Sequence, residues 1–186
     1  PLRDFPAERD YAPYTEYREN IYSGYYWYET ADKEDFWNSD FAKKRWNIKN
    51  GYEDVVQFPF GYGLSYTDFK WQVIESNVKN GSVLEKDGTI NMTVRVTNVG
   101  SVDGRDVVEL YYSAPYTKGG IEKAAIKLGA FAKTQTLKPG QYEDINLSVS
   151  VSEMKSYDCY DKNNNGFMGY ELEAGDYTIS LRTDVH

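Results

Sequence analysis

The stretch TINMTVRVT, residues 89–97, alternates apolar and polar side chains without a break. A period of two places every second side chain on the same face of an extended chain, which is typical of a strand with one face in a core and the other in water. The stretch therefore predicts a half-buried β-strand, with these apolar residues facing inward: Ile90, Met92, Val94 and Val96.

The same alternation recurs elsewhere between residue 66 and the end of the sequence. It is clear in 106–112, 144–151 and 176–183, and weaker in 69–78, 126–134 and 169–173. Turn-forming residues separate these stretches, at 86–88, 98–104, 138–141 and 173–176. About seven short strands without long helices between them predict an all-β, antiparallel β-sandwich of the fibronectin type III or immunoglobulin-like kind. The lack of a cysteine pair favours the fibronectin type III variant.

Residues 1–57 have a different texture, irregular and rich in charged and aromatic residues. Within them, the tyrosine-dense stretch 20–30 predicts a strand. Residues 31–46 predict a short helix, because acidic residues lead it and basic residues close it. In that helix Trp37 and Phe41, four residues apart, would share one face.

Composition excludes several classes of function. The net charge of −8 leaves no basic stripe for a nucleic-acid backbone, and no apolar run is long enough to predict a membrane helix. The one histidine, His186, is the last residue, where a side chain is expected to be frayed, so histidine-based catalytic triads and multi-histidine metal sites are not predicted. The single cysteine excludes an internal disulfide. No cofactor is predicted.

The decapeptide FPFGYGLSYT, residues 58–67, concentrates aromatic and backbone-bending residues but no acid, base or nucleophile. Pro59 fixes its own φ angle, and Gly61 and Gly63 allow backbone conformations that other residues avoid. Such a stretch is either a recognition surface or a structural hinge.

Several segments, taken in order, resemble one family. They are YRENIYSGYYWYET (17–30), VVQFPFGYGLSYTDF (55–69), VTNVGSVDGRDVVELYYSAP (96–115), KLGAFAKTQTLKPGQ (127–141) and EAGDYTISL (173–181). Together they are similar to the fibronectin type III-like module of family 3 glycoside hydrolases and to the end of the α/β domain that precedes it. Residues 31–54 and 156–172 depart from the family pattern and look like insertions.

The resemblance implies a domain organisation. Residues 1–57 would be the tail of the α/β domain with an insertion and linker, 58–67 the interdomain junction, and 68–186 the sandwich. The opening residues then read as sequence from within a longer protein, which the resemblance implies is a β-glucosidase. We interpret the junction as a clamp between two domains, with a sugar-stacking platform as the alternative; its residues are Phe58, Pro59, Phe60, Gly61, Tyr62, Gly63 and Tyr66.

The sequence offers no clear pair of carboxylates for glycoside hydrolysis. Retaining β-glycosidases use two carboxylates about 5–5.5 Å apart, and in the family the nucleophile is an aspartate in a Ser-Asp-Trp-like motif on a barrel. The tetrapeptide NSDF (38–41) resembles that motif only superficially, so Asp40 is interpreted as a solvated surface residue. Glu16, Glu19 and Glu29 have no evident partner and are interpreted in the same way.

The stretch DKNNNG, residues 161–166, partly matches a calcium-binding loop. Such loops place oxygen ligands at positions 1, 3 and 5, glycine at 6 and a bidentate glutamate at 12. Asp161, Asn163, Asn165 and Gly166 fit the first half, but position 12 is Leu172. An asparagine-rich turn without a metal is therefore the prediction, and calcium binding is the alternative.

Three functions compete at this point. The first is a non-catalytic accessory domain that packs against the barrel and α/β domains of a parent enzyme. The second is a carbohydrate-binding module for β-linked saccharides, and the third, a catalytic fragment, lacks supporting residues. An isolated chain is also expected to self-associate or to fold its first fifty residues onto the sandwich. Candidate sugar contacts for the second function are Tyr25, Trp27, Trp37, Trp46 and Tyr116.

Overall fold

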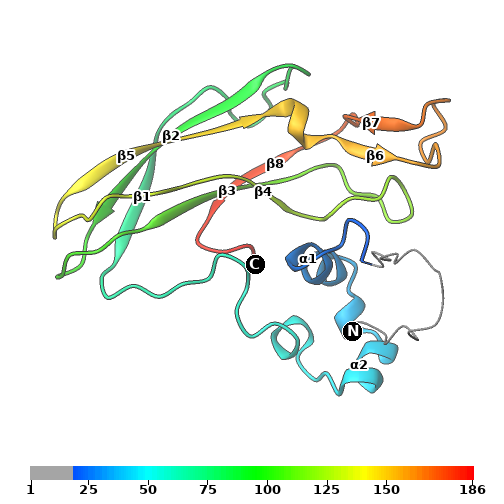
Figure 1. The fold of residues 1–186 in the computed structure, drawn as a ribbon, viewed down its shortest axis with the longest axis horizontal. Coiled ribbons are helices and arrows are strands. Elements are labelled where there is room, and N and C mark those ends of the chain that lie inside the picture. The colour runs from blue at the N-terminus through cyan, green and yellow to red at the C-terminus, as the bar shows by residue number, and fades with distance from the viewer. Residues whose placement is uncertain (1–18) are drawn as a thin grey trace, which may run out of the picture.

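The computed structural model describes residues 19–186 and consists of two three-stranded sheets, a separate two-stranded hairpin and a helical segment (Figure 1). One sheet has the strand order β1-β2-β5 and the other β4-β3-β8, and all the pairs are antiparallel. The predicted antiparallel sandwich is therefore confirmed. The strands are β1 Phe69–Ser76, β2 Thr89–Asn98, β3 Val107–Ser113, β4 Lys127–Lys133, β5 Tyr142–Ser150 and β8 Thr178–Arg182.

The core lies between the two sheets and is formed by the alternating apolar residues. In the β2–β5 pair, Ile90 lies opposite Val149, and Val94 lies opposite Ile145. All four are buried, as is Leu110 in the centre of the other sheet. Val151, expected at the end of a strand, lies instead in the 3-10 helix η3 (Val151–Met154), but its side chain still enters this core.

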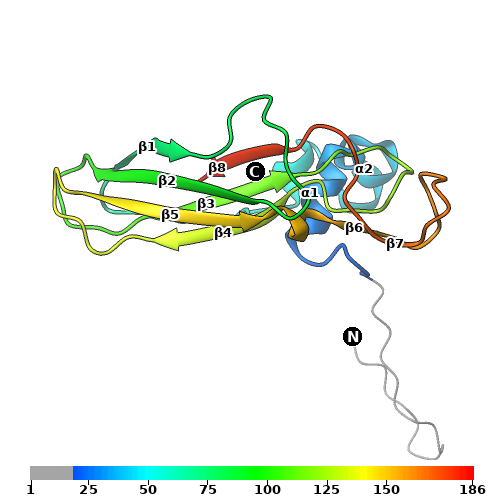
Figure 2. The same ribbon diagram turned by 90° about the horizontal axis from the view of Figure 1, so that it is seen from above.

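A separate hairpin, β6 (Ser156–Asp158) and β7 (Gly169–Glu171), extends from one end of the sandwich (Figure 2). It is formed by the segment 156–172, which we interpret from the sequence as an insertion. The loop between its strands holds the asparagine-rich stretch.

Strand β3 differs from the expected half-buried pattern because it is buried on both faces. Leu110 points into the core between the sheets, and Tyr111, on the opposite face, packs with Ile126 and Val185. The outer face is covered because the helical segment and the end of the chain lie against this sheet (Figure 1).

The prediction of a strand at 20–30 is wrong. Residues 25–33 form the helix α1 (Tyr25–Lys33), which follows Gly24 at a φ of 57°. The β-preference of tyrosine depends on its surroundings, and here α1 buries Glu29, Thr30 and Ala31 against other parts of the chain. Tertiary contacts therefore override the local preference.

The prediction of one helix over 31–46 is also wrong. Asp35 adopts a left-handed φ of 57° and ends the first helical stretch, and the 3-10 helix η1 (Phe36–Asn38) follows. Ser39 then begins α2 (Asp40–Trp46), where its hydroxyl accepts a hydrogen bond from the backbone N–H of Ala42. Trp37 and Phe41 consequently lie on different elements, the first buried and the second exposed.

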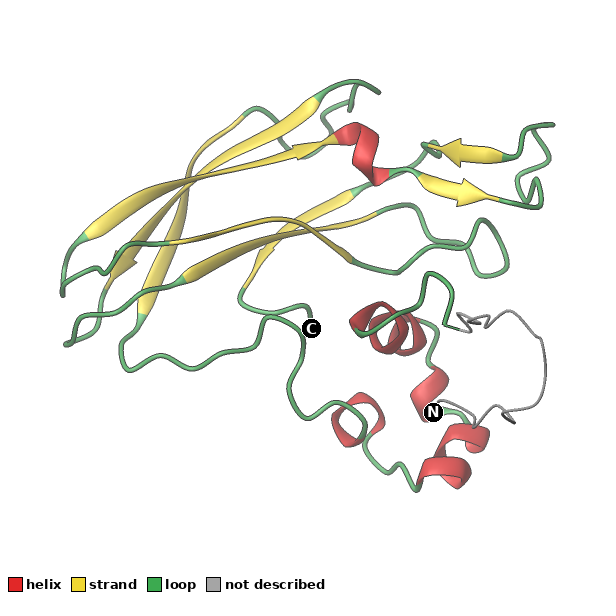
Figure 3. Ribbon diagram, in the orientation of Figure 1, coloured by secondary structure: helices red, strands yellow, loops and turns green. Residues whose placement is uncertain are grey.

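The helices are confined to one side of the molecule, apart from η3 (Figure 3). A further 3-10 helix, η2 (Gly51–Asp54), completes the helical segment, and its apolar centre consists of Ala31, Trp37, Ala42, Ile48 and Tyr52. This small core is separate from the one between the sheets. Within residues 19–186, no helix has the length and apolar character needed to cross a bilayer.

Candidate functional site

The junction 58–67 runs past the end of the chain and places most of its large side chains on the surface. Phe60 stacks on Tyr25 of α1, with the ring centroids 4.5 Å apart, and its carbonyl accepts a hydrogen bond of 2.9 Å from the N–H of Val185. Phe58 stacks on Tyr62 within the junction. Leu64 and Tyr66 are 89% and 100% exposed. The junction is therefore anchored at Phe60 and at Thr67, whose hydroxyl donates to Asn98 at 2.8 Å, and it is exposed at Leu64 and Tyr66.

Gly61 is the position at which the junction needs glycine. Its φ is 88°, and a Cβ atom there would collide with the carboxylate of Glu109. Gly63 has neither a positive φ nor a neighbour within contact distance, so of the two junction glycines only Gly61 adopts a backbone conformation that other residues avoid. Glu109 is itself held in place, because the hydroxyl of Tyr111 donates to it at 2.6 Å. Burial raises the pKa of this glutamate above its usual range.

Replacing Gly61 with alanine is expected to destabilise the protein by about 1–3 kcal/mol, because a Cβ atom is strained at this φ and displaces a buried carboxylate. Gly63→Ala is the matched control, two residues away and in open space, and should change the free energy of unfolding by less than about 0.5 kcal/mol. Urea unfolding of both variants measures the difference. Equal effects would show that the backbone at Gly61 is not the constraint.

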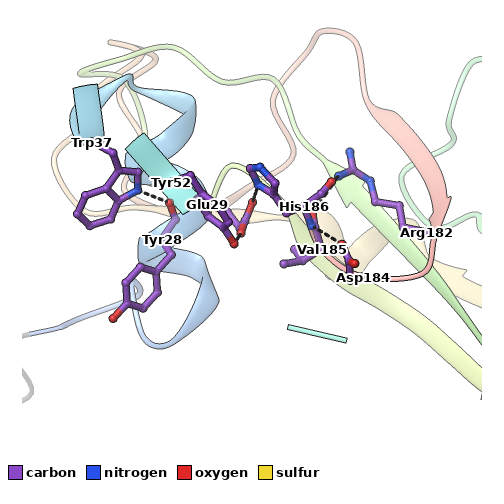
Figure 4. Close-up of polar contacts among 8 residues, drawn as sticks. All are labelled: Tyr28, Glu29, Trp37, Tyr52, Arg182, Asp184, Val185 and His186. Atoms are coloured by element: carbon purple, nitrogen blue, oxygen red, sulfur yellow. Dashed lines mark hydrogen bonds and ion pairs between the residues drawn. The ribbon is translucent and has the colours of Figure 1, made fainter. Parts of the chain in front are cut away.

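A second set of contacts joins the helical segment to the end of the chain (Figure 4). Glu29 accepts a hydrogen bond from the hydroxyl of Tyr52 and lies 3.2 Å from Nδ1 of His186. The imidazole stacks flat on the Tyr52 ring at 3.8 Å. Arg182 fixes the adjoining backbone by donating to the carbonyl oxygens of Val185 and His186.

These contacts correct two expectations. Glu29 is buried rather than solvated, and His186 is ordered rather than frayed. Burial raises the pKa of Tyr52, and its hydrogen bond to Glu29 raises that pKa further, so its hydroxyl stays protonated at neutral pH and donates. Glu19 is exposed, as expected, and Glu16 lies outside the described residues.

The Glu29 side chain also lines a cavity of about 510 Å³ between α1 and the β3–β8 side of the sandwich. Asp32, Asp176 and Arg182 line it as well. The carboxylate of Glu29 is already engaged by Tyr52 and His186, and Asp40 is exposed on α2, away from this cavity. Glu29 therefore acts structurally in this arrangement, as an acceptor that joins two parts of the chain.

The aromatic candidates for sugar contact are not arranged as a platform. Trp37 is only 3% exposed, and its indole N–H donates to the carbonyl of Tyr28 at 3.1 Å. The Trp27–Trp37 and Trp37–Trp46 ring pairs meet edge to face, at 84° and 72°. Outside this cluster, the hydroxyl of Tyr25 accepts the N–H of Leu128, and that of Tyr116 donates to Glu34. A sugar ring stacks on a flat aromatic face, and these rings form no coplanar row.

Sequence reasoning missed Tyr52, Glu109 and Tyr111. Each is a polar residue whose role depends on a partner that local patterns do not reveal. Only the alternation in 106–112 gave a signal, since Tyr111 and Glu109 fall on the face opposite Leu110.

Comparison with known proteins agrees with this architecture. The fibronectin type III-like domain family matches residues 106–185. β-Glucosidase A of Butyrivibrio fibrisolvens is 33% identical over 99% of this chain, and a β-glucosidase of Ruminococcus albus is 33% identical over the same share. The crystal structure of a β-glucosidase from Paenibacillus barengoltzii superposes with a TM-score of 0.69, at 37% identity over 91% of this chain.

The chain spans only 21% and 16% of the length of the two relatives and 16% of the solved structure. In each of them the matching part is one segment of a much larger protein. Residues 106–185 thus match the fibronectin type III-like domain family, and the chain as a whole is similar to a small segment of these β-glucosidases.

Proposed function

We propose that this chain is a non-catalytic accessory part of a family 3 β-glucosidase, in which it packs against the barrel and α/β domains. The observation that carries the proposal is the exposed junction. It places Leu64 and Tyr66 almost wholly in solvent, in a chain homologous to one segment of larger enzymes. Large exposed apolar side chains that gather in one stretch mark a surface of contact with another domain.

We propose the following domain organisation. Residues 1–57 belong with the α/β domain, 58–67 form the junction, and 68–186 form the sandwich. Within the described part, α1 is joined to the sandwich by polar contacts: Thr30 accepts the N–H of Ala125, and Tyr25 accepts that of Leu128. The sandwich would thereby hold the helical segment in a fixed position, and with it the adjoining α/β domain.

The test compares two settings for the same substitutions. In the isolated chain, Leu64→Ser and Tyr66→Ser should change the free energy of unfolding by less than about 0.5 kcal/mol, because both side chains are exposed. In the full-length parent they should destabilise by about 1.5–3 kcal/mol each, because the other domains would cover them. Val83→Ser, at an exposed position on the loop between β1 and β2, is the control and should be neutral in both settings. Equal effects in the two settings would refute the docking role.

The same proposal makes a prediction about the hydrolysis of β-glucosides. The isolated chain should release no product from an aryl β-glucoside, whereas the full-length parent should do so. Turnover by the isolated chain that persists at constant specific activity through repeated purification would contradict a non-catalytic role.

A further inference from the structure

The hairpin loop between β6 and β7 brings oxygen-bearing side chains together. Glu171, in β7, points back toward the loop, where its Oε2 accepts hydrogen bonds from the side-chain amides of Asn163 at 2.9 Å and Asn165 at 2.6 Å. Asp161 begins the loop, and its carboxylate accepts the backbone N–H groups of Asn165 and Gly166. Two carboxylates and two carboxamides therefore meet around one turn.

The carboxylate of Glu171 is incompletely satisfied. Its second oxygen, Oε1, is buried and has no hydrogen-bond partner among residues 19–186. In the same described part of the chain, no lysine, arginine or histidine lies within ion-pair distance of Glu171 or Asp161. A buried carboxylate oxygen without a donor or cation is costly, and a bound cation would remove that cost.

The position of Glu171 resolves the mismatch seen in the sequence. Counting from Asp161, a calcium-binding loop requires glutamate at position 12, but Glu171 occupies position 11. In the structure the β6–β7 hairpin directs this side chain toward the loop, although the loop is one residue shorter than the standard one. Gly166, at position 6, has a φ of 80° and makes the sharp turn that such loops need.

From this juxtaposition we propose that residues 161–171 bind Ca²⁺ through Asp161, Asn163, Asn165 and Glu171. Each asparagine presents its amide nitrogen to Glu171, and a half-turn of the carboxamide exchanges that nitrogen for the oxygen. The rotation gives up four hydrogen bonds: the two that the carboxamides donate to Glu171, and those that Asn163 accepts from the N–H of Asn165 and Asn165 accepts from the N–H of Phe167. Together with the presence of only two negative ligands, this loss predicts weak binding, with a Kd of about 10⁻⁴–10⁻³ M.

The ligand chemistry favours Ca²⁺ over other ions. All four side chains offer oxygen, the ligand of hard cations, and the loop contains no histidine. Among residues 19–186, no three acidic, histidine or cysteine side chains gather, so the proposed site depends on the oxygens of its two carboxamides as well as on its two carboxylates. Mg²⁺ demands strict octahedral geometry, whereas Ca²⁺ accepts the irregular set that a shortened loop provides.

The experiment titrates the complete chain with CaCl₂ and follows backbone amide chemical shifts by NMR. Saturable shifts confined to residues 161–171 are expected, with midpoints at about 10⁻⁴–10⁻³ M, and MgCl₂ should bind at least about tenfold more weakly. The Glu171→Gln variant keeps the size and shape of the side chain but removes a charged ligand. Its Ca²⁺ affinity should fall about tenfold or more.

Asp176→Asn is the control, because it removes the same charge from an exposed position on the next loop. This variant should bind Ca²⁺ as the unmodified chain does. Absence of saturable shifts up to about 10 mM Ca²⁺, ten times the upper limit expected for the Kd, would overturn the proposal. Equal loss of affinity in the two variants would also overturn it, by showing general attraction to an acidic protein. Neither result bears on the docking role of the junction.

Discussion

Trp37→Ala is expected to unfold the helical segment of residues 25–54 while the two sheets stay folded. Trp37 is the largest buried side chain in the small core of that segment, and truncating a buried tryptophan costs about 3–5 kcal/mol. The substitution also removes the hydrogen bond to the carbonyl of Tyr28. Because Trp37 has no part in the core between the sheets, the loss should remain local.

Hydrogen exchange followed by mass spectrometry measures this directly. Peptides from 25–54 should lose protection in Trp37→Ala, and peptides from β2 and β5 should keep it. Trp46→Ala is the control, since Trp46 belongs to the same aromatic cluster but is 49% exposed, and it should cost far less. Loss of protection in both regions would show that the helices and the sandwich unfold as one unit.

Leu110→Ala is expected to destabilise the sandwich itself by about 2–5 kcal/mol. Leu110 is fully buried in β3, the central strand of its sheet, where it lies between Ala130 of β4 and Leu181 of β8. Removing it opens a cavity that strands paired on both sides cannot close by moving. Urea unfolding should therefore show a lower midpoint with an unchanged slope.

The matched control for Leu110 is Phe131→Ala in the neighbouring strand. This substitution removes a larger side chain, but one that is 65% exposed, so it should cost less than about 1 kcal/mol. If the two variants were equally destabilised, side-chain size rather than burial would determine the loss, and the assignment of the core would be wrong.

The sandwich was predictable because its signal is local. Alternation in 89–97 and 144–151 follows directly from burial on one face, and Ile90 and Val149 lie inside as the pattern predicts. The exception is β3, in which the outward-facing Tyr111 is also buried. Its cover comes from Val185 and from α1, and no pattern within 106–112 contains that information.

The helical segment was mispredicted because its stability comes from distant partners. Tyrosine-rich stretches favour strands on average, but α1 is held by contacts from Thr30 to Ala125 and from Tyr25 to Leu128, about a hundred residues away. The fraying expected of His186 is wrong because its partners, too, are distant in the sequence. Sequence position suggested a free end, whereas the Tyr52 ring and Glu29 hold it.

The loop of residues 161–171 shows a different limit of prediction from sequence. Counted from Asp161, Glu171 is at position 11, whereas the standard loop has its glutamate ligand at position 12, so the spacing alone argues against Glu171 as a ligand. The count assumes the helical framework of the standard loop, and here the framework is a β-hairpin. The direction of a side chain depends on the element that carries it, which the residue spacing alone does not state.

The contact between Glu29 and His186 spans 157 positions of the chain and has a consequence for biosynthesis. Translation proceeds from the N-terminus, so α1 emerges from the ribosome before His186, which contacts Glu29 of this helix, is synthesised. During that interval Glu29 can accept the hydroxyl of Tyr52 but has no imidazole to contact. Contacts of such high sequence separation form slowly, so the Glu29–His186 contact should form after the local contacts within the helical segment.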